Sequence, residues 1–157
     1  MINYLLSDVY NLDHEHYYMQ LPMLTATIAD SYAQHFMWLE KTFIPGLRHG
    51  NRGYVFAEDK DNIHLAGCSL LKNGPDEKKL CCLFVDPAYR KQGIASKLIE
   101  NTFQVLGTDK PVMTVSEQNL AQLMPLIKRY GFVLTNVRTG AYKSGVKEYY
   151  YNEGLAR

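Results

Sequence analysis

The sequence has neither a long apolar run nor an excess of charge of one sign, and each absence narrows the class of protein. No stretch approaches the about 18 apolar residues of a membrane helix, and the start 1–4 lacks the basic region of a signal peptide. We therefore expect a cytoplasmic protein with no membrane partner. Lysine and arginine number 17 against 16 aspartate and glutamate residues. This balance predicts no nucleic-acid partner, because such surfaces are strongly basic.

Cysteine is scarce as well. The three cysteines are Cys68, Cys81 and Cys82, and they form no C-x-x-C pair and have no histidine at the spacing of a metal site. Their neighbours are apolar. We expect all three to be small buried residues in a reducing compartment, and we expect no bound metal.

The spacing of apolar residues changes along the 157-residue chain, whose length suits one domain. Helical spacing predicts helices over about 12–18 and 27–43, with Pro45-Gly46 closing that region. Later segments alternate between strand and helix patterns. The sequence predicts strands at 2–6, 53–57, 63–71, 79–85, 111–115, from 131, and at 146–151. It also predicts a helix at 119–129 and another whose apolar residues run from 94 to 106. This order predicts a single mixed α/β domain over 1–157, in which strand 79–85 is buried on both faces.

The segment 85–95 carries the clearest chemical signal. A buried strand ends here and a helix is expected to begin near Lys91 or Gln92. The first N–H groups of a helix have no intrahelical partner, and its dipole attracts anions. Gly93 has no Cβ to keep a phosphate away from the backbone, and Arg90 adds positive charge. The segment predicts a phosphate-bearing ligand, although neither a Rossmann nor a Walker motif occurs.

The pattern Arg90-x-x-Gly93-x-Ala95, directly after a Val-Asp-Pro strand end, resembles the acetyl-CoA motif of the GNAT superfamily of N-acetyltransferases. Asn119 and Gly131-Phe132 also fall where this family has an asparagine after the fifth strand and a Gly-Phe pair opening the sixth. The predicted element order is that of the GNAT fold. The resemblance implies a mixed α+β sheet of about seven strands with helices on both faces, splayed between strands 4 and 5.

The resemblance also implies which residues hold acetyl-CoA as cosubstrate. The pantetheine arm would run along 83–85, where a backbone N–H near Phe84 would polarise the thioester carbonyl. The pyrophosphate would sit on the N–H groups of 92–96, and Asn119 would bond the pantetheine or order the nearby loop. The full predicted set is Leu83, Phe84, Val85, Arg90, Lys91, Gln92, Gly93, Ile94, Ala95, Ser96 and Asn119.

The residues that would move protons are where this sequence departs from the family pattern. An alkylammonium has a pKa of about 10.4, so a base must take its proton before attack. Many relatives use a glutamate near the start of the fourth strand, where this chain has Lys79; Glu77 is the candidate base instead. The usual acid is a tyrosine at the position occupied here by Ile127. Tyr130 is the candidate acid, with Tyr142 as the alternative.

These features predict an acetyl-CoA-dependent N-acetyltransferase in which a primary amine attacks the thioester directly. One alternative is an acyl-CoA sensor module with little catalysis, and another is a toxin-like acetyltransferase of aminoacyl-tRNA. The near-neutral charge of the chain counts against the aminoacyl-tRNA acetyltransferase. Aromatic residues of the N-terminal third are expected to wall the acceptor site, and its acids Asp13, Glu15 and Asp30 would favour a cationic amine. Many relatives form dimers, so a homodimer is one candidate assembly.

Overall fold

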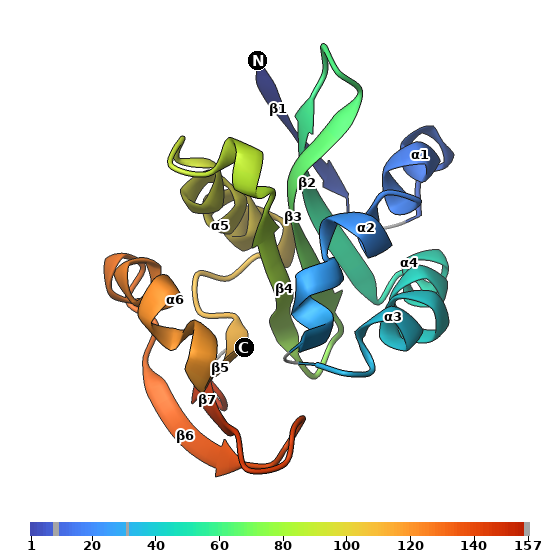
Figure 1. Cartoon of the computed structure of the whole chain (residues 1–157). Helices are drawn as coiled ribbons and strands as arrows, with labels where there is room; N and C mark the ends of the chain where they lie inside the picture. Colours follow the sequence, from blue (N-terminus) through green and yellow to red (C-terminus); the bar gives the residue numbers. More distant parts are fainter. Residues whose placement is uncertain (8–9, 31, 156–157) are drawn as a thin grey trace.

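A seven-stranded mixed sheet runs through the molecule (Figure 1). The computed structural model describes residues 1–7, 10–30 and 32–155. The strands lie in the order β1-β2-β3-β4-β5-β7-β6, and within the described residues every neighbouring pair is antiparallel except β4 and β5. Their bounds are β1 (Ile2–Ser7), β2 (Arg52–Asp59), β3 (His64–Asn73), β4 (Lys78–Val85), β5 (Val112–Ser116), β6 (Leu134–Thr139) and β7 (Lys147–Tyr151). The expected mixed sheet with a GNAT-like strand order is confirmed.

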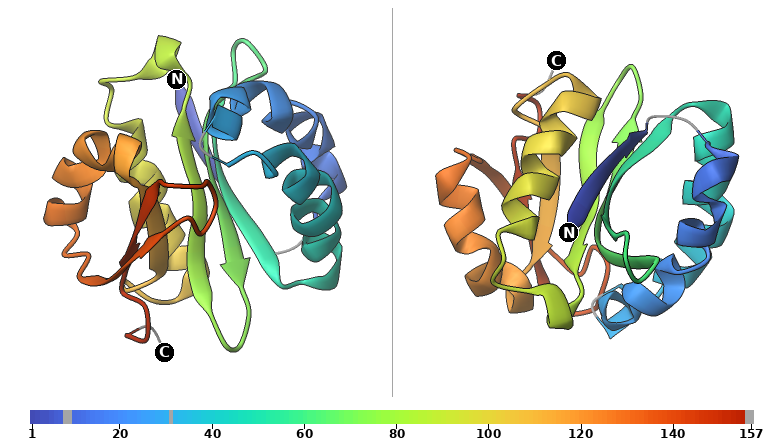
Figure 2. Two further views of the ribbon diagram at one scale, coloured as in Figure 1. Left: turned by 60° about the horizontal axis from the view of Figure 1, so that its bottom comes forward. Right: turned by 90° about the horizontal axis from the view of Figure 1, so that it is seen from above.

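Helices cover both faces of this sheet (Figures 1 and 2). One face carries the N-terminal helices and the other carries the two long C-terminal ones. The first group is η1 (Leu12–His14), α1 (Glu15–Tyr18), α2 (Leu21–Leu24), η2 (Ala26–Asp30), α3 (His35–Trp38), η3 (Leu39–Phe43) and α4 (Ile44–His49). The second is α5 (Ile94–Leu106) and α6 (Glu117–Arg129), with the short turn η4 (Pro87–Tyr89) leading into α5. None of the described helices is long and apolar enough to cross a membrane.

Alternation along the strands divides the core between the two helical layers. Tyr54 and Phe56 of β2 face the N-terminal helices, whereas Val55 and Ala57 face α5. Helix α5 forms because its apolar residues recur at helical spacing, which buries one stripe of the helix. It ends at Gly107, whose φ of 68° is the left-handed conformation that terminates helices. Both the helix and its end agree with the sequence prediction.

The predicted helix over 27–43 is wrong in its boundaries. The region is two separate helical segments in the structure. The first is η2, and the second runs from α3 through the π-helical turn η3 into α4. Pro45 does not close the region, because it lies in the first turn of α4, where a missing N–H costs little. The helix ends instead at Gly50, with a φ of 79°.

Strand β4 leaves its neighbour β5 after a short contact. The two strands pair only at Lys79–Val112 and Leu80–Met113 and then diverge, which confirms the expected splay. An irregularity in the pairing of β4 with β3 makes Cys81 an extra residue, as in a β-bulge. The expectation that this strand is buried on both faces is wrong: only Leu80 and Cys82 are fully buried, because the divergence exposes the rest of the strand.

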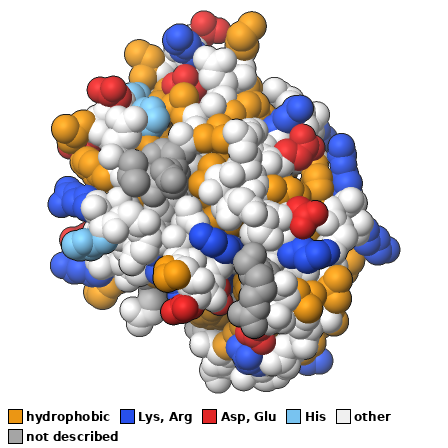
Figure 3. Space-filling view, turned by 180° about the vertical axis from the view of Figure 1, so that it is seen from behind, with side chains coloured by type: hydrophobic (Ala, Val, Ile, Leu, Met, Phe, Trp, Pro, Cys, Tyr) orange, Lys and Arg blue, Asp and Glu red, His pale blue; other side chains and the backbone are white. Residues whose placement is uncertain are grey.

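Charge of the two signs is mixed over the face seen from behind (Figure 3). Lysine and arginine side chains are interspersed there with acidic and apolar ones. The described residues of this face therefore form no continuous basic surface of the kind that binds nucleic acid backbones.

Candidate active site

The loop between β4 and α5 leads into a helix end whose first N–H groups have no intrahelical partner. Helix α5 begins at Ile94, later than the expected start near Lys91 or Gln92. The reason is local: Lys91 has a φ of 63° and Gly93 a φ of 78°, and neither conformation belongs to a right-handed helix. The first intrahelical bond runs from the Lys97 N–H to the Gly93 carbonyl, at 3.2 Å. The three N–H groups between them precede the helical bonding pattern.

Gly93 leaves room for a ligand at this helix end. A Cβ built on Gly93 would meet no atom within 4 Å. The glycine is thus required by its left-handed φ and not by crowding, and the space in front of it is open. The open space, the free N–H groups and the helix dipole together fit a bound phosphate. The residues present therefore suit the pyrophosphate of a CoA-type molecule.

A network of hydrogen bonds holds the loop in this shape. Asp86 accepts a bond of 2.9 Å from the Ala88 N–H and shares one of 2.8 Å with His64. Burial alone would raise the pKa of the Asp86 carboxyl, but these bonds lower it below its ordinary value. Arg90 folds back over the strand end, where its Nε donates to the Val85 carbonyl at 2.9 Å. The protein's own hydrogen bonds therefore support the shape of this loop.

Beside the divergence of β4 and β5 lies a cavity of about 370 Å³. Most of its lining comes from the segment 28–38, residues 79–83 of β4, strand β5 and the start of α6, and β2, β3 and the turn before β4 add Arg52, Lys72 and Glu77. Tyr32 and Trp38 line it on the side of the N-terminal helices, and Tyr142 lines it from the β6–β7 loop. Of the N-terminal aromatic residues, Tyr32 and Trp38 line this cavity, and their place in the wall of an acceptor site stays a prediction. A volume of this size suits a small molecule or the end of a larger one.

A buried glutamate lies directly behind the cavity wall. Tyr32 donates a hydrogen bond of 2.8 Å to Glu148, which is 1% exposed. Burial raises the pKa of the Glu148 carboxyl, while the Tyr32 hydroxyl and the positive charge of Lys79 oppose that rise. Sequence reasoning missed this pair. The signal present was the alternation along β7, which places Glu148 on the same side as the buried Tyr150.

A domain model described as "Acetyltransferase (GNAT) domain" matches residues 50–134, which is more than half of the chain. The chain belongs to the GNAT acetyltransferase family. The matched region runs from the start of β2 through the open loop and α6, so it includes most of the site. Membership in this family supports acyl transfer as the general type of reaction.

Solved structures share the fold of this GNAT acetyltransferase at low sequence identity. A GNAT-family acetyltransferase from Bacillus cereus is 18% identical with a TM-score of 0.64, over 96% of this chain and 95% of that one. An aminoglycoside 6'-N-acetyltransferase solved with coenzyme A is 14% identical with a TM-score of 0.69, over 96% and 94%. A spermidine/spermine N-acetyltransferase from Vibrio cholerae is 15% identical with a TM-score of 0.63, over 96% and 90%. A search of curated protein sequences finds no match.

The structure brings several predicted residues of the GNAT acetyltransferase together at the cavity. Leu83, Asn119 and Glu77 line it. The Asn119 side-chain amide donates to the Ser116 hydroxyl at 3.0 Å, so it ties the start of α6 to the end of β5. Glu77 forms an ion pair of 3.2 Å with Lys72. The roles of these residues stay predictions.

The two candidate tyrosines lie in different places. Tyr130 packs its ring on Phe103 of α5 and donates a hydrogen bond of 2.6 Å to Glu100. It is not among the residues that line the cavity, whereas Tyr142 is. Tyr142 also packs edge-on against Tyr32, with ring centres 5.0 Å apart. Tyr142 therefore lies at the cavity and Tyr130 does not, and the role of either as proton donor stays a prediction.

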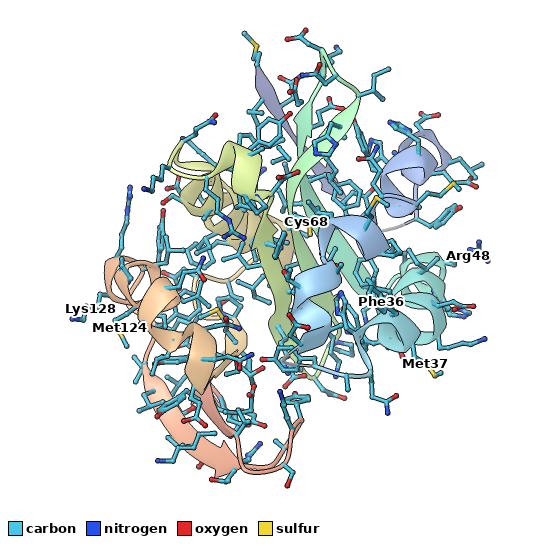
Figure 4. The ribbon with its side chains drawn as sticks, viewed as in Figure 1. Phe36, Met37, Arg48, Cys68, Met124 and Lys128 are labelled. Atoms are coloured by element: carbon cyan, nitrogen blue, oxygen red, sulfur yellow. The ribbon has the colours of Figure 1, made fainter. Side chains whose placement is uncertain are left out.

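The three cysteines are free thiols, and one of them differs from expectation. Cys68 and Cys82 are buried as predicted, and Cys68 lies in the interior beneath the N-terminal helices (Figure 4). Cys81 is only half-buried and lines the cavity, because the β4 irregularity turns it toward the opening. Burial raises the pKa of the Cys81 thiol, which disfavours a reactive thiolate. Over the described residues, no three histidine, cysteine or acidic side chains gather as metal ligands.

Proposed function

We propose that this protein is an acetyl-CoA-dependent N-acetyltransferase that transfers an acetyl group to a primary amine by direct attack. One observation carries the proposal: strand β4 connects the cavity, at Leu83, to the open loop at Gly93. A ligand lying along the freed edge of β4 would have its phosphates at the loop and its reactive end at the cavity. The likeness to an N-acetyltransferase solved with coenzyme A supports this reading. The cytoplasm, where acetyl-CoA is available, is the expected compartment.

The predicted cofactor residues fall into two groups along this path. Residues 83–85 present backbone groups where β5 has moved away, so they would pair with the pantetheine arm as an added strand does. The N–H groups of 94–96 would hold the pyrophosphate, with Arg90 and Lys91 adding positive charge. When bound, acetyl-CoA supplies an activated acetyl thioester, whose carbonyl a backbone N–H near Phe84 would polarise.

Two side chains of the cavity wall would manage the protons. Glu77 would take a proton from the acceptor amine through water, since Glu77 lines the cavity but precedes Leu83 by six positions in the chain. Tyr142 would return a proton to the departing thiolate, and we propose it in place of Tyr130 because Tyr130 is bonded to Glu100 outside the cavity. General acid–base catalysis of this kind contributes about 10²–10⁴-fold in rate.

Thermal unfolding with and without acetyl-CoA tests the cofactor site. Ligand at about a hundred times its Kd should stabilise the parent by about 2.7 kcal/mol. Gly93→Glu should abolish this gain, because its side chain would fill the open space. Gly107→Glu is the matched control: it also replaces a left-handed glycine, with φ 68° and no atom within 4 Å of the added Cβ, but at the far end of α5. The control should keep the gain.

Thiol release from acetyl-CoA across a panel of amines separates an enzyme from an acyl-CoA sensor. Amine-dependent release is expected. Stabilisation by acetyl-CoA without release for any amine would support the sensor. No stabilisation at about millimolar acetyl-CoA would overturn the proposed function, since enzymes typically have KM values of about 1 μM to 1 mM for their substrates.

A further inference from the structure

Three basic residues lie in register across neighbouring strands at one end of the cavity. Arg52 of β2 pairs with Lys72 of β3, which pairs in turn with Lys79 of β4. Residues directly opposite in antiparallel strands point to the same face, with Cβ atoms about 4.5–5.5 Å apart. All three side chains line the cavity. We call Arg52, Lys72 and Lys79 the cationic row.

Such a row is unfavourable unless something negative faces it, because like charges directly opposite destabilise a sheet. The protein supplies one carboxylate: Glu77 lies 3.2 Å from the Lys72 ammonium. Arg52 and Lys79 form no ion pair within 4.0 Å in the part of the chain that is described. Lys78, on the opposite face, is satisfied differently, by a bond of 2.6 Å to Asn73.

Within the part of the chain that is described, Arg52 is oriented by contacts that leave most of its donors unused. Its guanidinium lies 5.7 Å from the ring centre of Trp38, and one N–H points at the Cys81 sulfur at 3.6 Å. A thiol is a weak acceptor, and an arginine has five N–H donors in a planar fork that matches carboxylate and phosphate. The side chain is thus already oriented for an anion.

The other titratable groups near the cationic row do not cancel its charge within the cavity. Glu148 attracts Lys79 but lies behind Tyr32 and does not line the cavity. His35 lines the cavity, but burial lowers its pKa and its ring bonds to Thr25. The lining therefore holds three cations and one carboxylate.

We infer that the cationic row binds an anionic group, a carboxylate or a phosphate, carried by the amine acceptor. The inference rests on the proposed function only in treating the bound molecule as the acceptor. The acceptor would be a small molecule that carries both an amine and either a carboxylate or a phosphate. Its amine would reach toward Leu83. The sequence expectation of a cationic acceptor loses its basis, because Asp13, Glu15 and Asp30 are exposed and none lines the cavity.

Fluorescence of Trp38 provides a direct test. It is the only tryptophan of the chain, and it lines the cavity beside Arg52. Three matched pairs differ by one anionic group: phenylalanine and phenethylamine, ε-aminohexanoate and hexylamine, and phosphoethanolamine and ethanolamine. The anionic member of at least one pair should bind about tenfold or more tightly, as expected for hydrogen bonds to charged groups. The pair that responds identifies carboxylate or phosphate.

Variants show whether the cationic row is responsible. Arg52→Gln should reduce the preference for the anionic member to about threefold or less, and Lys79→Gln should also weaken it, which covers the case that the first variant fails to fold. Arg48→Gln is the control and should keep the full preference, because Arg48 is exposed on the outer side of α4 (Figure 4). Equal binding of both members of every pair, or equal loss in all three variants, would overturn the inference.

The titration needs no acetyl-CoA, so the two proposals fail separately. Anion-selective binding in a protein that acetyl-CoA does not stabilise would keep the anion site and remove the proposed function. Turnover of amines that lack an anionic group, without any preference for those that carry one, would keep the proposed function and remove the anion site.

Discussion

Tyr32 donates a hydrogen bond of 2.8 Å to Glu148, a residue 116 positions further along the chain. The bond joins the segment before α3 to strand β7 across the back of the cavity. Because Glu148 is 1% exposed, water cannot replace the lost donor. Tyr32→Phe should therefore lower the free energy of unfolding by about 1–3 kcal/mol.

Urea unfolding measures that loss, and Tyr10→Phe provides the matched control. The Tyr10 hydroxyl bonds at 3.4 Å to an exposed carboxylate, that of Glu15. Its removal should change stability by less than about 0.5 kcal/mol. Equal effects of the two variants would show that the Tyr32–Glu148 bond adds nothing beyond a surface contact.

The pH dependence of stability should reveal the burial of Glu148. Burial raises the pKa of this carboxyl in the folded state, and the negative charge of Glu117 raises it slightly further. The Tyr32 hydrogen bond and the positive charge of Lys79 oppose this rise. A group with a raised folded pKa favours folding below its unfolded pKa of about 4.3, and that contribution is lost as pH rises through the folded value. Glu148→Gln has no carboxyl to ionise, so it does not lose this stabilising contribution as the pH rises.

Chemical unfolding of both proteins from about pH 4 to pH 8 makes the comparison. The stability of Glu148→Gln relative to the parent should increase as the pH rises from the lower end and then level off. The glutamine can still accept the Tyr32 hydrogen bond, so the difference isolates the charge. A relative stability that is constant with pH, or that falls, would contradict the burial argument.

Tyr142 and Tyr130 should respond differently to loss of their hydroxyls. Tyr142 lines the cavity, and Tyr142→Phe should lower kcat by about tenfold or more if its hydroxyl supplies a proton. Tyr130→Phe should leave kcat within about threefold, because that hydroxyl is bonded to Glu100 on α5. Steady-state kinetics with one accepted amine decides between them. A large kcat loss in Tyr130→Phe alone would restore the original candidate.

Glu77→Gln should change catalysis and anion binding in opposite directions. If Glu77 relays the amine proton through water, kcat should fall by about tenfold or more. The same change removes the carboxylate beside the cationic row, so anion binding measured by Trp38 fluorescence should tighten a few-fold. Stability should change by less than about 1 kcal/mol, since the Lys72–Glu77 pair is partly exposed. Tighter anion binding with unchanged kcat would leave Glu77 a charge partner only.

Local features of the chain could be predicted because neighbouring residues determine them. Helix α5, its end at Gly107 and the loop before it follow from apolar spacing, glycine and proline within about twenty residues. The predicted start of α5 is too early, because Lys91 and Gly93 adopt left-handed conformations that apolar spacing does not reveal. The N-terminal helices were misjudged for a similar reason: packing against β2 decides where those short helices break.

The amino-acid sequence by itself determined the order of helices and strands along the chain and predicts a phosphate site around Gly93, because both rest on residues close together in the chain. Only the tertiary structure decided which distant side chains share the cavity. It aligned Arg52, Lys72 and Lys79 through the register of three strands, and it buried Glu148 behind Tyr32. A shift of one residue in either pairing would turn these side chains to the other face of the sheet, and such a register is set by the whole sheet rather than by any single segment.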